Sequence, residues 1–580
     1  MITTASKLLN HQHIILGIHD GHNSSATLMV NGNVIYSIQE ERLTRRKNEC
    51  GYPKLAIDEV LHLSNIKPAE LSEIAVASEY MHSKSHLENV STWYKASSKR
   101  QSENLASLNN HQTQQDNLKR RQLERTQEIS DHLIVDKSKV HFYNHHECHA
   151  AAAYYGSDFK FDEEILVLTC DGAGDGLCAS VSIGHKGKIR RISESDRKNS
   201  PGKVYSRVTY YLGFQPWEHE YKIMGMAPYA EPKYSAEINK LLGNMLTYDA
   251  KTLKFESNDN LHMDELYPIL KTIFERKRFD AICGGVQLFI ENLITNWVAA
   301  AIEVTGIRKI VLGGGVFMNV KCNKLISELE VVDSMYIFPS CGDESLSFGS
   351  AWIANSKLQN SSSELPKLRH LYLGGECSDD EILESESVLG TLNYQCDTYP
   401  DINARIAELL SEGEIVARCT GRMEWGARAL GNRSILSAPS EWENVEKINS
   451  MIKKRDFWMP FAPSIQAEYA DQLVCNGKSI NSPFMMLAFD SIPSKVSQFR
   501  AALHPRDKTA RVQYVHKESN PEYWCIIDNF RKITGIPCVL NTSFNLHGFP
   551  LVYKPKEAFE VFLNSGLRYL AINSRLYSKI

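Results

Sequence analysis

Three apolar strands that break into glycine- or aspartate-rich turns constrain this fold more than any other feature of the sequence. They lie in residues 14–42, which begin IILGIHDG, in 165–176, ILVLTCDGAGDG, and in 307–319, IRKIVLGGGVFMN. The first opens a meander, because Asn31-Gly32 between two apolar runs is a strong hairpin signal. The second continues into further strands, and the third runs into a predicted helix. The repetition predicts a duplicated α/β core that binds a nucleotide in a cleft between two lobes.

This pattern is similar to that of actin and sugar-kinase ATPases, and it accounts for only the first part of the chain. At 580 residues and roughly 150 residues per domain, the chain is long enough for roughly two to four domains. Ser, Asn and Pro cluster at residues 355–367, which predicts a linker between a first domain at 1–360 and a second at 361–580. The polar segment 82–127 is predicted to be an insertion, either a helical excursion or a lid, with no chemistry assigned to it.

The net charge and the cysteine pattern indicate which binding partners and which cellular compartment to expect. The net charge of -4 provides no basic field for nucleic acid or an anionic membrane surface. The sequence has no run of about 18 apolar residues, so no membrane span is expected, and its amino end lacks the apolar stretch of a signal peptide. The 13 cysteines form no C-x-x-C pair, which favours a reducing compartment. We therefore expect a cytoplasmic protein without nucleic-acid or membrane partners.

The segment YNHHECHAAAAYYG, residues 143–156, is a candidate metal site. His145 and His149 are four positions apart, so both imidazoles project from one face of a predicted helix that Asn144 can cap. This spacing suits bidentate metal binding, and it equally suits a plain polar helix start. His146 points elsewhere, and the H-E-x-x-H protease motif is not formed. The alanines that follow predict close packing of another element on this helix.

Two aspartates are candidates for further ligands. Asp171 lies in CDGAGDG and Asp343 in SCGDES. A set of two histidines and two aspartates suits Fe(II), Mn(II) or Zn(II) and leaves positions open for phosphate oxygens. Each aspartate also has a plainer interpretation, as a turn residue that hydrogen-bonds its own backbone.

Basic residues gather in two motifs of the second half, GRMEWGARALGNRS and IKKRDFW. Guanidinium forks among glycines can converge on an anion together with backbone amides. The alternative for some of them is a solvated cationic face. The candidates for a phosphate site are Arg422, Arg428, Arg433, Lys453, Lys454 and Arg455.

Taken together, the motifs resemble one family, the NodU/TobZ-type O-carbamoyltransferases. In the first half they are LGIHDGHNSSA, EERLTRRKN, HHECHAAAAYY, CDGAGDG, GGGVFMNVKCN and CGDESLSFGSA. In the second half they are GRMEWGARALGNRSIL, IKKRDFWMPFAPSI, ARVQYV and PCVLNTSFNLHGFPLV. The resemblance implies an N-terminal actin/sugar-kinase-like domain of the Kae type, as in the ATPases of tRNA threonylcarbamoyladenosine synthesis. It also implies an α/β YrdC-like second domain.

The resemblance implies two reactions in one chain. Carbamoyl phosphate and ATP would give carbamoyl adenylate in the YrdC-like domain, and the Kae-type domain would transfer the carbamoyl group to an acceptor hydroxyl and release AMP. Carbamoyl phosphate would be held by Arg428, Lys453, Arg511 and Ser543. One departure concerns Met459, where the family often has arginine before P-F-A-P, so that phosphate contact is either lost or supplied by another residue.

At the Kae-type site the resemblance implies Mg(II)-ATP beside a bound metal, most often Fe(II). The predicted nucleotide contacts are Gly172, Gly174, Gly313, Gly314, Gly315 and Asn319, although a tight strand-to-helix turn explains the three consecutive glycines equally well. His22 is the candidate base for the acceptor, Asp20 would orient His22 or the acceptor, and Lys47 would stabilise charge on the carbamoyl oxygen or the leaving phosphate. Lys222 is a further residue expected to reach the cleft.

Other functions stay open at this point. A relative that only binds ATP, or one that serves tRNA threonylcarbamoylation, would share the first domain, whereas a sugar kinase would leave the second domain unexplained. The motifs do not identify the acceptor. A polar natural product is expected, with a saxitoxin-type guanidinium alkaloid as one candidate, and both a monomer and a homodimer stay open.

Overall fold

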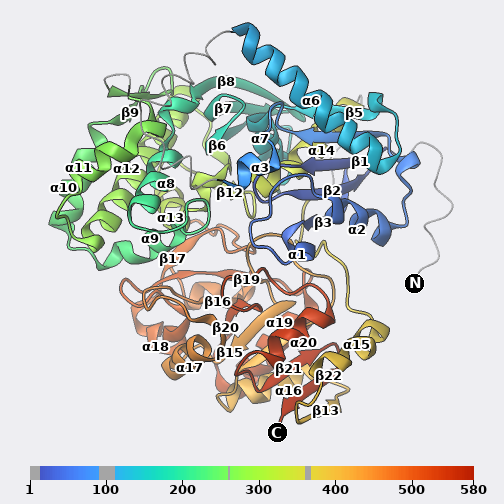
Figure 1. The fold of residues 1–580 in the computed structure, drawn as a ribbon. Coiled ribbons are helices and arrows are strands. Elements are labelled where there is room, and N and C mark those ends of the chain that lie inside the picture. The colour runs from blue at the N-terminus through green and yellow to red at the C-terminus, as the bar shows by residue number, and fades with distance from the viewer. Residues whose placement is uncertain (1–12, 90–110, 259–260, 359–366) are drawn as a thin grey trace.

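The computed structural model describes residues 13–89, 111–258, 261–358 and 367–580 (Figure 1). The predicted domain boundary at 360 and the central part of the predicted insertion lie outside these ranges. α-Helices and mixed sheets alternate along the described chain, which confirms the predicted α/β class.

Two five-stranded sheets with the same strand order form the N-terminal domain. In the first, the order β3-β2-β1-β4-β5 joins an antiparallel meander to parallel strands, and the second repeats this as β8-β7-β6-β11-β12. The predicted duplicated core is therefore confirmed. The strands are β1 Ile14–His19, β2 Ser25–Val30, β3 Asn33–Gln39, β4 Glu73–Ala77, β5 Val140–Tyr143, β6 Ile165–Gly174, β7 Leu177–His185, β8 Lys188–Asp196, β11 Lys309–Gly313 and β12 Ser334–Ile337.

Two helices pack between these sheets. α7 (His145–Tyr155) lies on β6 and β11, α14 (Leu346–Leu358) lies on β1 and β4, and the helices pack against each other. Their approach needs small residues, because a Cβ on Gly349 would lie 1.9 Å from the carbonyl oxygen of Cys148. The predicted close packing on the alanine face of α7 is confirmed. On the other side of the first sheet, α2 (Lys54–Ser64) packs on β2 and β3.

The second lobe carries a helical layer, drawn in green in Figure 1. Its central helix α12 (Phe279–Thr305) is long and apolar enough to cross a membrane by length and composition, but 67% of the relevant window is buried inside the protein, as in a core helix. The other elements are α8 Pro201–Tyr211, α9 Glu220–Met226, α10 Pro232–Gly243, α11 Leu266–Ile273, α13 Val320–Glu328, β9 Leu246–Tyr248 and β10 Phe255–Ser257.

The described ends of the predicted insertion are helical and reach the core. α3 (Lys84–Glu88) precedes the undescribed residues and α6 (His111–Leu133) follows them. From α6, the buried Arg125 donates to both carboxylate oxygens of Asp20, at 2.6 and 2.7 Å, and to the carbonyl oxygens that end β4. A paired buried charge of this kind costs several kcal/mol, on the order of 3–5, when one partner is removed. The insertion helix is therefore anchored beside the strand that carries HDGH.

The C-terminal domain, coloured orange to red in Figure 1, is an eight-stranded mixed sheet in the order β13-β22-β21-β14-β15-β20-β16-β19. Helices α16 and α19 cover one face, while α15, α17 and α20 lie with a second apolar cluster on the other. The strands are β13 Tyr394–Thr398, β14 Val416–Cys419, β15 Arg433–Ser437, β16 Ala462–Gln466, β19 Gln513–Val515, β20 Cys538–Ser543, β21 Tyr569–Ile572 and β22 Arg575–Lys579. The helices are α15 Asp379–Ser385, α16 Ile402–Ser411, α17 Trp442–Ile448, α18 Val496–Phe499, α19 Pro521–Thr534 and α20 Pro555–Leu563, and β17 (Ala488–Asp490) pairs with β18 (Thr509–Arg511).

Candidate functional site

The predicted metal ligands converge at the ends of four elements. His145 and His149 project from the first turns of α7, Asp171 lies near the end of β6, and Asp343 precedes α14. One donor atom from each lies within 4.8 Å of the others. The helix begins as expected, because the Asn144 side chain accepts a hydrogen bond from the Glu147 amide at 3.3 Å.

The surroundings of this His/Asp cluster fit a cation. The Nε2 atoms of His145 and His149 are buried without a hydrogen-bond partner, while their Nδ1 atoms face the hydroxyls of Ser78 and Ser345 at 3.0 and 3.3 Å. Metal-bound histidines are oriented in this way by a second partner. Burial opposes protonation of His145, but the carboxylates of Asp343 and Asp171 outweigh it and raise its pKa to about 9. A divalent ion would satisfy both the orphaned nitrogens and the carboxylates.

The glycine turns pack directly on this cluster. A Cβ on Gly174 would overlap the ring of His145, and Gly314 adopts φ +97° against the carbonyl oxygen of Cys170. The Gly315 amide donates to Oδ1 of Asp171 at 2.9 Å, so the glycine turn and the metal ligand form one unit. The space beside Gly172 is open, because a Cβ at this position would meet no atom within 4 Å.

Two more predicted nucleotide residues are explained by packing. A Cβ on Gly313 would lie 2.7 Å from the His149 carbonyl oxygen. Asn319 caps α13 through the Cys322 amide at 3.1 Å and exchanges hydrogen bonds with Gln287 at 2.9 and 3.0 Å. Its side chain is therefore engaged within the protein, and its predicted nucleotide contact stays a prediction.

His22 lies beside the His/Asp cluster and is half-buried. Its Nε2 faces the Trp217 carbonyl oxygen at 3.3 Å, and because a carbonyl accepts hydrogen bonds, Nε2 carries the proton and Nδ1 is the basic atom. Burial lowers the pKa of His22 below its ordinary value, so the ring is neutral near pH 7. His19, which the sequence interpretation did not single out, connects it to the cluster: its Nε2 faces the His22 carbonyl at 3.0 Å and Asp343 at 4.0 Å.

The other predicted catalytic residues are held by partners from distant segments. Both oxygens of Asp20 accept from Arg125, so this carboxylate anchors α6, and its predicted role in orienting His22 or the acceptor stays a prediction. The Lys47 ammonium pairs with Glu218 at 2.8 Å. Lys222 pairs across the domain boundary with Asp456 at 3.1 Å.

A second cluster, which we call the cation cluster, contains Arg428, Lys453, Arg455 and Arg511. Within the described ranges none of these four side chains makes an ion pair with a carboxylate. Burial and neighbouring cations lower the pKa of Lys453 and Arg511, and they lower that of Arg455 to about 10. The Nε of Arg511 is buried without a partner. Lys453 is buried and the three arginines are half-buried. Cations that repel one another in such a site, with no carboxylate paired to them, are stabilised by an anion.

Lys453 and Ser543, both predicted to hold carbamoyl phosphate, contact each other although they are ninety positions apart. The ammonium donates to Oγ of Ser543 at 3.0 Å and to Oδ1 of Asn545 at 2.6 Å. Asn545 was not expected from the sequence, although it closes the quoted N-T-S-F-N motif.

The remaining basic residues of the two motifs serve the fold. Arg422 donates to the carbonyl oxygens of Gly374 and Ile35 at 3.0 and 2.7 Å, and the fully buried Arg433 donates to backbone carbonyls of its own domain. Lys454 is exposed and ends a short helical turn with φ +45°.

Met459 faces Gly225 of α9, whereas Arg455, four positions earlier, lies in the cation cluster.

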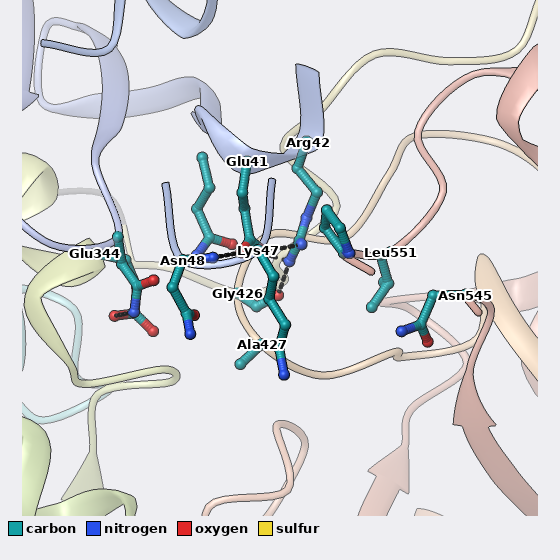
Figure 2. A network of polar contacts seen from close by, with 12 residues as sticks. Glu41, Arg42, Lys47, Asn48, Glu344, Gly426, Ala427, Asn545 and Leu551 are labelled. Carbon is teal, nitrogen blue, oxygen red and sulfur yellow. Dashed lines mark hydrogen bonds and ion pairs between the residues drawn. The ribbon is translucent and has the colours of Figure 1, made fainter. Parts of the chain in front are cut away.

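The glycine loop that carries Arg428 is fixed from both domains. Within its own domain, Oε1 of the buried Glu424 accepts from the amides of Leu430, Asn432 and Arg433 at 2.7, 3.1 and 3.1 Å. From the N-terminal domain, Arg42 of the short helix α1 (Glu41–Thr44) donates to the Gly426 carbonyl at 2.6 Å (Figure 2).

A second link joins this loop to the His/Asp cluster. The amide of Ala427 donates to Oγ of Ser340 at 3.1 Å, and that hydroxyl donates to the buried carboxylate of Glu344, the residue next to Asp343. Figure 2 shows the Lys47 side chain extending past Gly426 and Ala427 in the same region. Two hydrogen bonds, from Ala427 to Ser340 and from Ser340 to Glu344, therefore join the neighbour of Arg428 to the neighbour of Asp343.

Comparisons with known proteins agree with this arrangement. The chain matches the family model of the carbamoyltransferase N-terminus over residues 14–352 and that of the carbamoyltransferase C-terminus over 407–579. It is 30% identical to an uncharacterized protein of Methanocaldococcus jannaschii, over 98% of this chain and 100% of the relative. It is 29% identical to nodulation protein NolNO of Sinorhizobium fredii, over 96% of this chain and 79% of the relative. Full-length HypF in its phosphate- and nucleotide-bound form covers 60% of this chain and 56% of its own, at 14% identity and a TM-score of 0.32, which is too low for a functional argument.

The His/Asp cluster predicts one divalent transition metal per chain. We expect elemental analysis of purified His149→Ala to show the metal lost, because the substitution removes one of four donors. His146→Ala is the matched control, since His146 is equally buried on α7 but bonds Thr169 instead, and it should keep the metal. Full occupancy in His149→Ala would contradict the assignment.

Proposed function

This chain belongs to the carbamoyltransferase family and is a carbamoyl-transferring enzyme, and we propose that it is an ATP-dependent O-carbamoyltransferase with two active sites. The YrdC-like domain, assigned to residues 361–580, makes carbamoyl adenylate. The Kae-type domain, assigned to residues 1–360, transfers the carbamoyl group to a hydroxyl. The observation that carries this division is the cation cluster, because its four basic residues come from the C-terminal domain and make no ion pair with a described carboxylate, whereas the His/Asp cluster comes from the N-terminal domain.

The cation cluster suits carbamoyl phosphate, a small dianion. Arg428, Lys453, Arg511 and Ser543 hold it, and Arg455 supplies the contact that the family arginine would have made at Met459. Water cleaves the carbamoyl–phosphate bond to give carbamate and inorganic phosphate. A carbamate oxygen then attacks the α-phosphorus of ATP, and pyrophosphate leaves with the electron pair of the broken P–O bond.

Transfer takes place beside the His/Asp cluster. A divalent ion held by the His/Asp cluster would act as a Lewis acid toward phosphate oxygens. Fe(II) is the preferred ion, with Mn(II) and Zn(II) as the alternatives. Nδ1 of the neutral His22 accepts the proton of the acceptor hydroxyl as its oxygen attacks the carbamoyl carbon, and the bond from that carbon to the AMP oxygen breaks. Lys47 approaches the developing charge from the α1 loop.

The acceptor is proposed to be the hydroxyl of a polar natural product, with a guanidinium alkaloid among the candidates. A cavity of about 460 Å³ supports a small-molecule acceptor, because Pro216 in its wall directly precedes Trp217, whose carbonyl contacts His22. Its walls include Tyr210, Phe214, Gln215, His219 and Lys222.

Arg428→Ala should separate the two half-reactions. Loss of one charged phosphate contact should lower carbamoyl-phosphate-dependent AMP formation by about 10²- to 10³-fold, yet leave transfer from supplied carbamoyl adenylate intact. Lys454→Ala is the control, because it removes an exposed cation of a neighbouring motif. A folded Arg428→Ala enzyme that loses both reactions equally would contradict two separate sites.

His22→Asn should uncouple ATP use from product formation. The asparagine keeps a polar contact but cannot accept the hydroxyl proton, so transfer should fall by ~10²- to 10⁴-fold. AMP should still accumulate as carbamoyl adenylate hydrolyses, with normal metal content. The assay uses an acceptor found in a panel of hydroxylated natural products by the mass gain of one carbamoyl group. Transfer at the normal rate would contradict the role of His22 as the base and would indicate that the substrate itself accepts the proton.

A further inference from the structure

A pair of cysteines lies behind the glycine loop of the C-terminal domain. Sγ of Cys377 and Sγ of Cys419 are 3.6 Å apart, and both side chains are buried. Cys419 ends β14 and Cys377 lies just before α15, so two separate segments bring the sulfurs together. The proposed reactions use neither thiol.

The pair shares its pocket with a buried cation. Nη2 of Arg433 donates to Sγ of Cys377 at 3.4 Å, and its other donors go to the carbonyl oxygens of Thr420, Gly421 and Tyr553. In the described part of the chain no carboxylate makes an ion pair with Arg433. The buried carboxylate of Glu424 is the nearby anion, but it bonds the backbone amide of Arg433 and not its guanidinium. A thiolate at Cys377 would give the guanidinium an anion in direct contact.

The two thiols are chemically unequal. The hydrogen bond from Cys419 and the nearby Arg433 overcome burial and lower the pKa of Cys377 to about 7, while the same hydrogen bond and burial raise the pKa of Cys419. Glu381 and Lys554, which pair with each other at 2.8 Å, are the other charged groups facing Cys377. A thiolate next to a thiol is the arrangement of a redox-active pair.

We propose that Cys377 and Cys419 are a reversible oxidation site that forms a disulfide with peroxide. The Cys377 thiolate attacks one peroxide oxygen, the O–O bond breaks, and hydroxide leaves as water after taking a proton from solvent. The Cys419 sulfur then attacks the resulting sulfenic acid, the S–O bond breaks, and the departing hydroxide takes the Cys419 proton as a second water. Two thiols are oxidised and one peroxide is reduced to two waters.

The disulfide is linked to carbamoyl phosphate binding through Arg433. Oxidation replaces the thiolate by a neutral disulfide, so the Arg433 guanidinium loses the anion that it contacts directly while it still holds the Thr420 and Gly421 carbonyls. These residues begin the loop that carries Arg428. This consequence rests on the proposed function, whereas the oxidation site itself does not.

The first test is chemical and needs no substrate. In a Cys396→Ser/Cys475→Ser background, which removes the exposed cysteines, peroxide should lower the denatured thiol count by two and yield a Cys377–Cys419 peptide in a non-reducing digest. Cys419→Ser should trap a sulfenic acid at Cys377 with dimedone, whereas Cys377→Ser should leave Cys419 unlabelled. No disulfide, a disulfide elsewhere, or equal labelling of both single variants would overturn the proposal.

The second test is kinetic. The oxidised enzyme should show a KM for carbamoyl phosphate about fivefold to tenfold higher, as for loss of one charge-assisted hydrogen bond, and dithiothreitol should restore it. Cys419→Ser should keep its KM after peroxide. An unchanged KM in disulfide-bonded enzyme would contradict the link to Arg433. A reduced enzyme without carbamoyl-phosphate-dependent AMP formation would instead contradict the proposed function.

Discussion

The hydrogen bond from Arg42 to the Gly426 carbonyl fixes the glycine loop of the C-terminal domain against the N-terminal domain, and the position of Arg428 depends on that loop. It comes from a side chain that is 2% exposed, and it holds the loop that presents Arg428. The parallel link from Ala427 through Ser340 to Glu344 ends one residue from Asp343. A shift of the glycine loop would therefore change the positions of residues at both clusters.

The two clusters carry opposite electrostatic deficits, and this explains why they suit different ligands. At the His/Asp cluster, the carboxylates and the imidazole nitrogens without a hydrogen-bond partner suit a cation, whereas the four basic side chains of the cation cluster suit an anion. Carbamate and its adenylate react readily with water, so production beside the site of use limits their loss. Fixed contacts between the domains suit such a sequence of reactions.

Local periodicity made part of this predictable. The spacing of His145 and His149 and the cap at Asn144 follow from helix geometry within a few residues, and the strand and glycine patterns indicated the duplicated core. Side-chain contacts between residues far apart in the sequence could not be predicted. Asp20 meets Arg125 from a segment to which no chemistry was assigned, and Arg422 and Arg433 differ from Arg428 only in the carbonyl oxygens that the fold places before them.

We propose that carbamoyl adenylate connects the two domains, and the phosphorus products of one reaction mixture show whether it forms. Phosphorus NMR of enzyme with ATP, carbamoyl phosphate and an acceptor should show AMP, pyrophosphate and inorganic phosphate, with one AMP for each carbamoylated product. Formation of ADP in place of AMP and pyrophosphate would contradict the account.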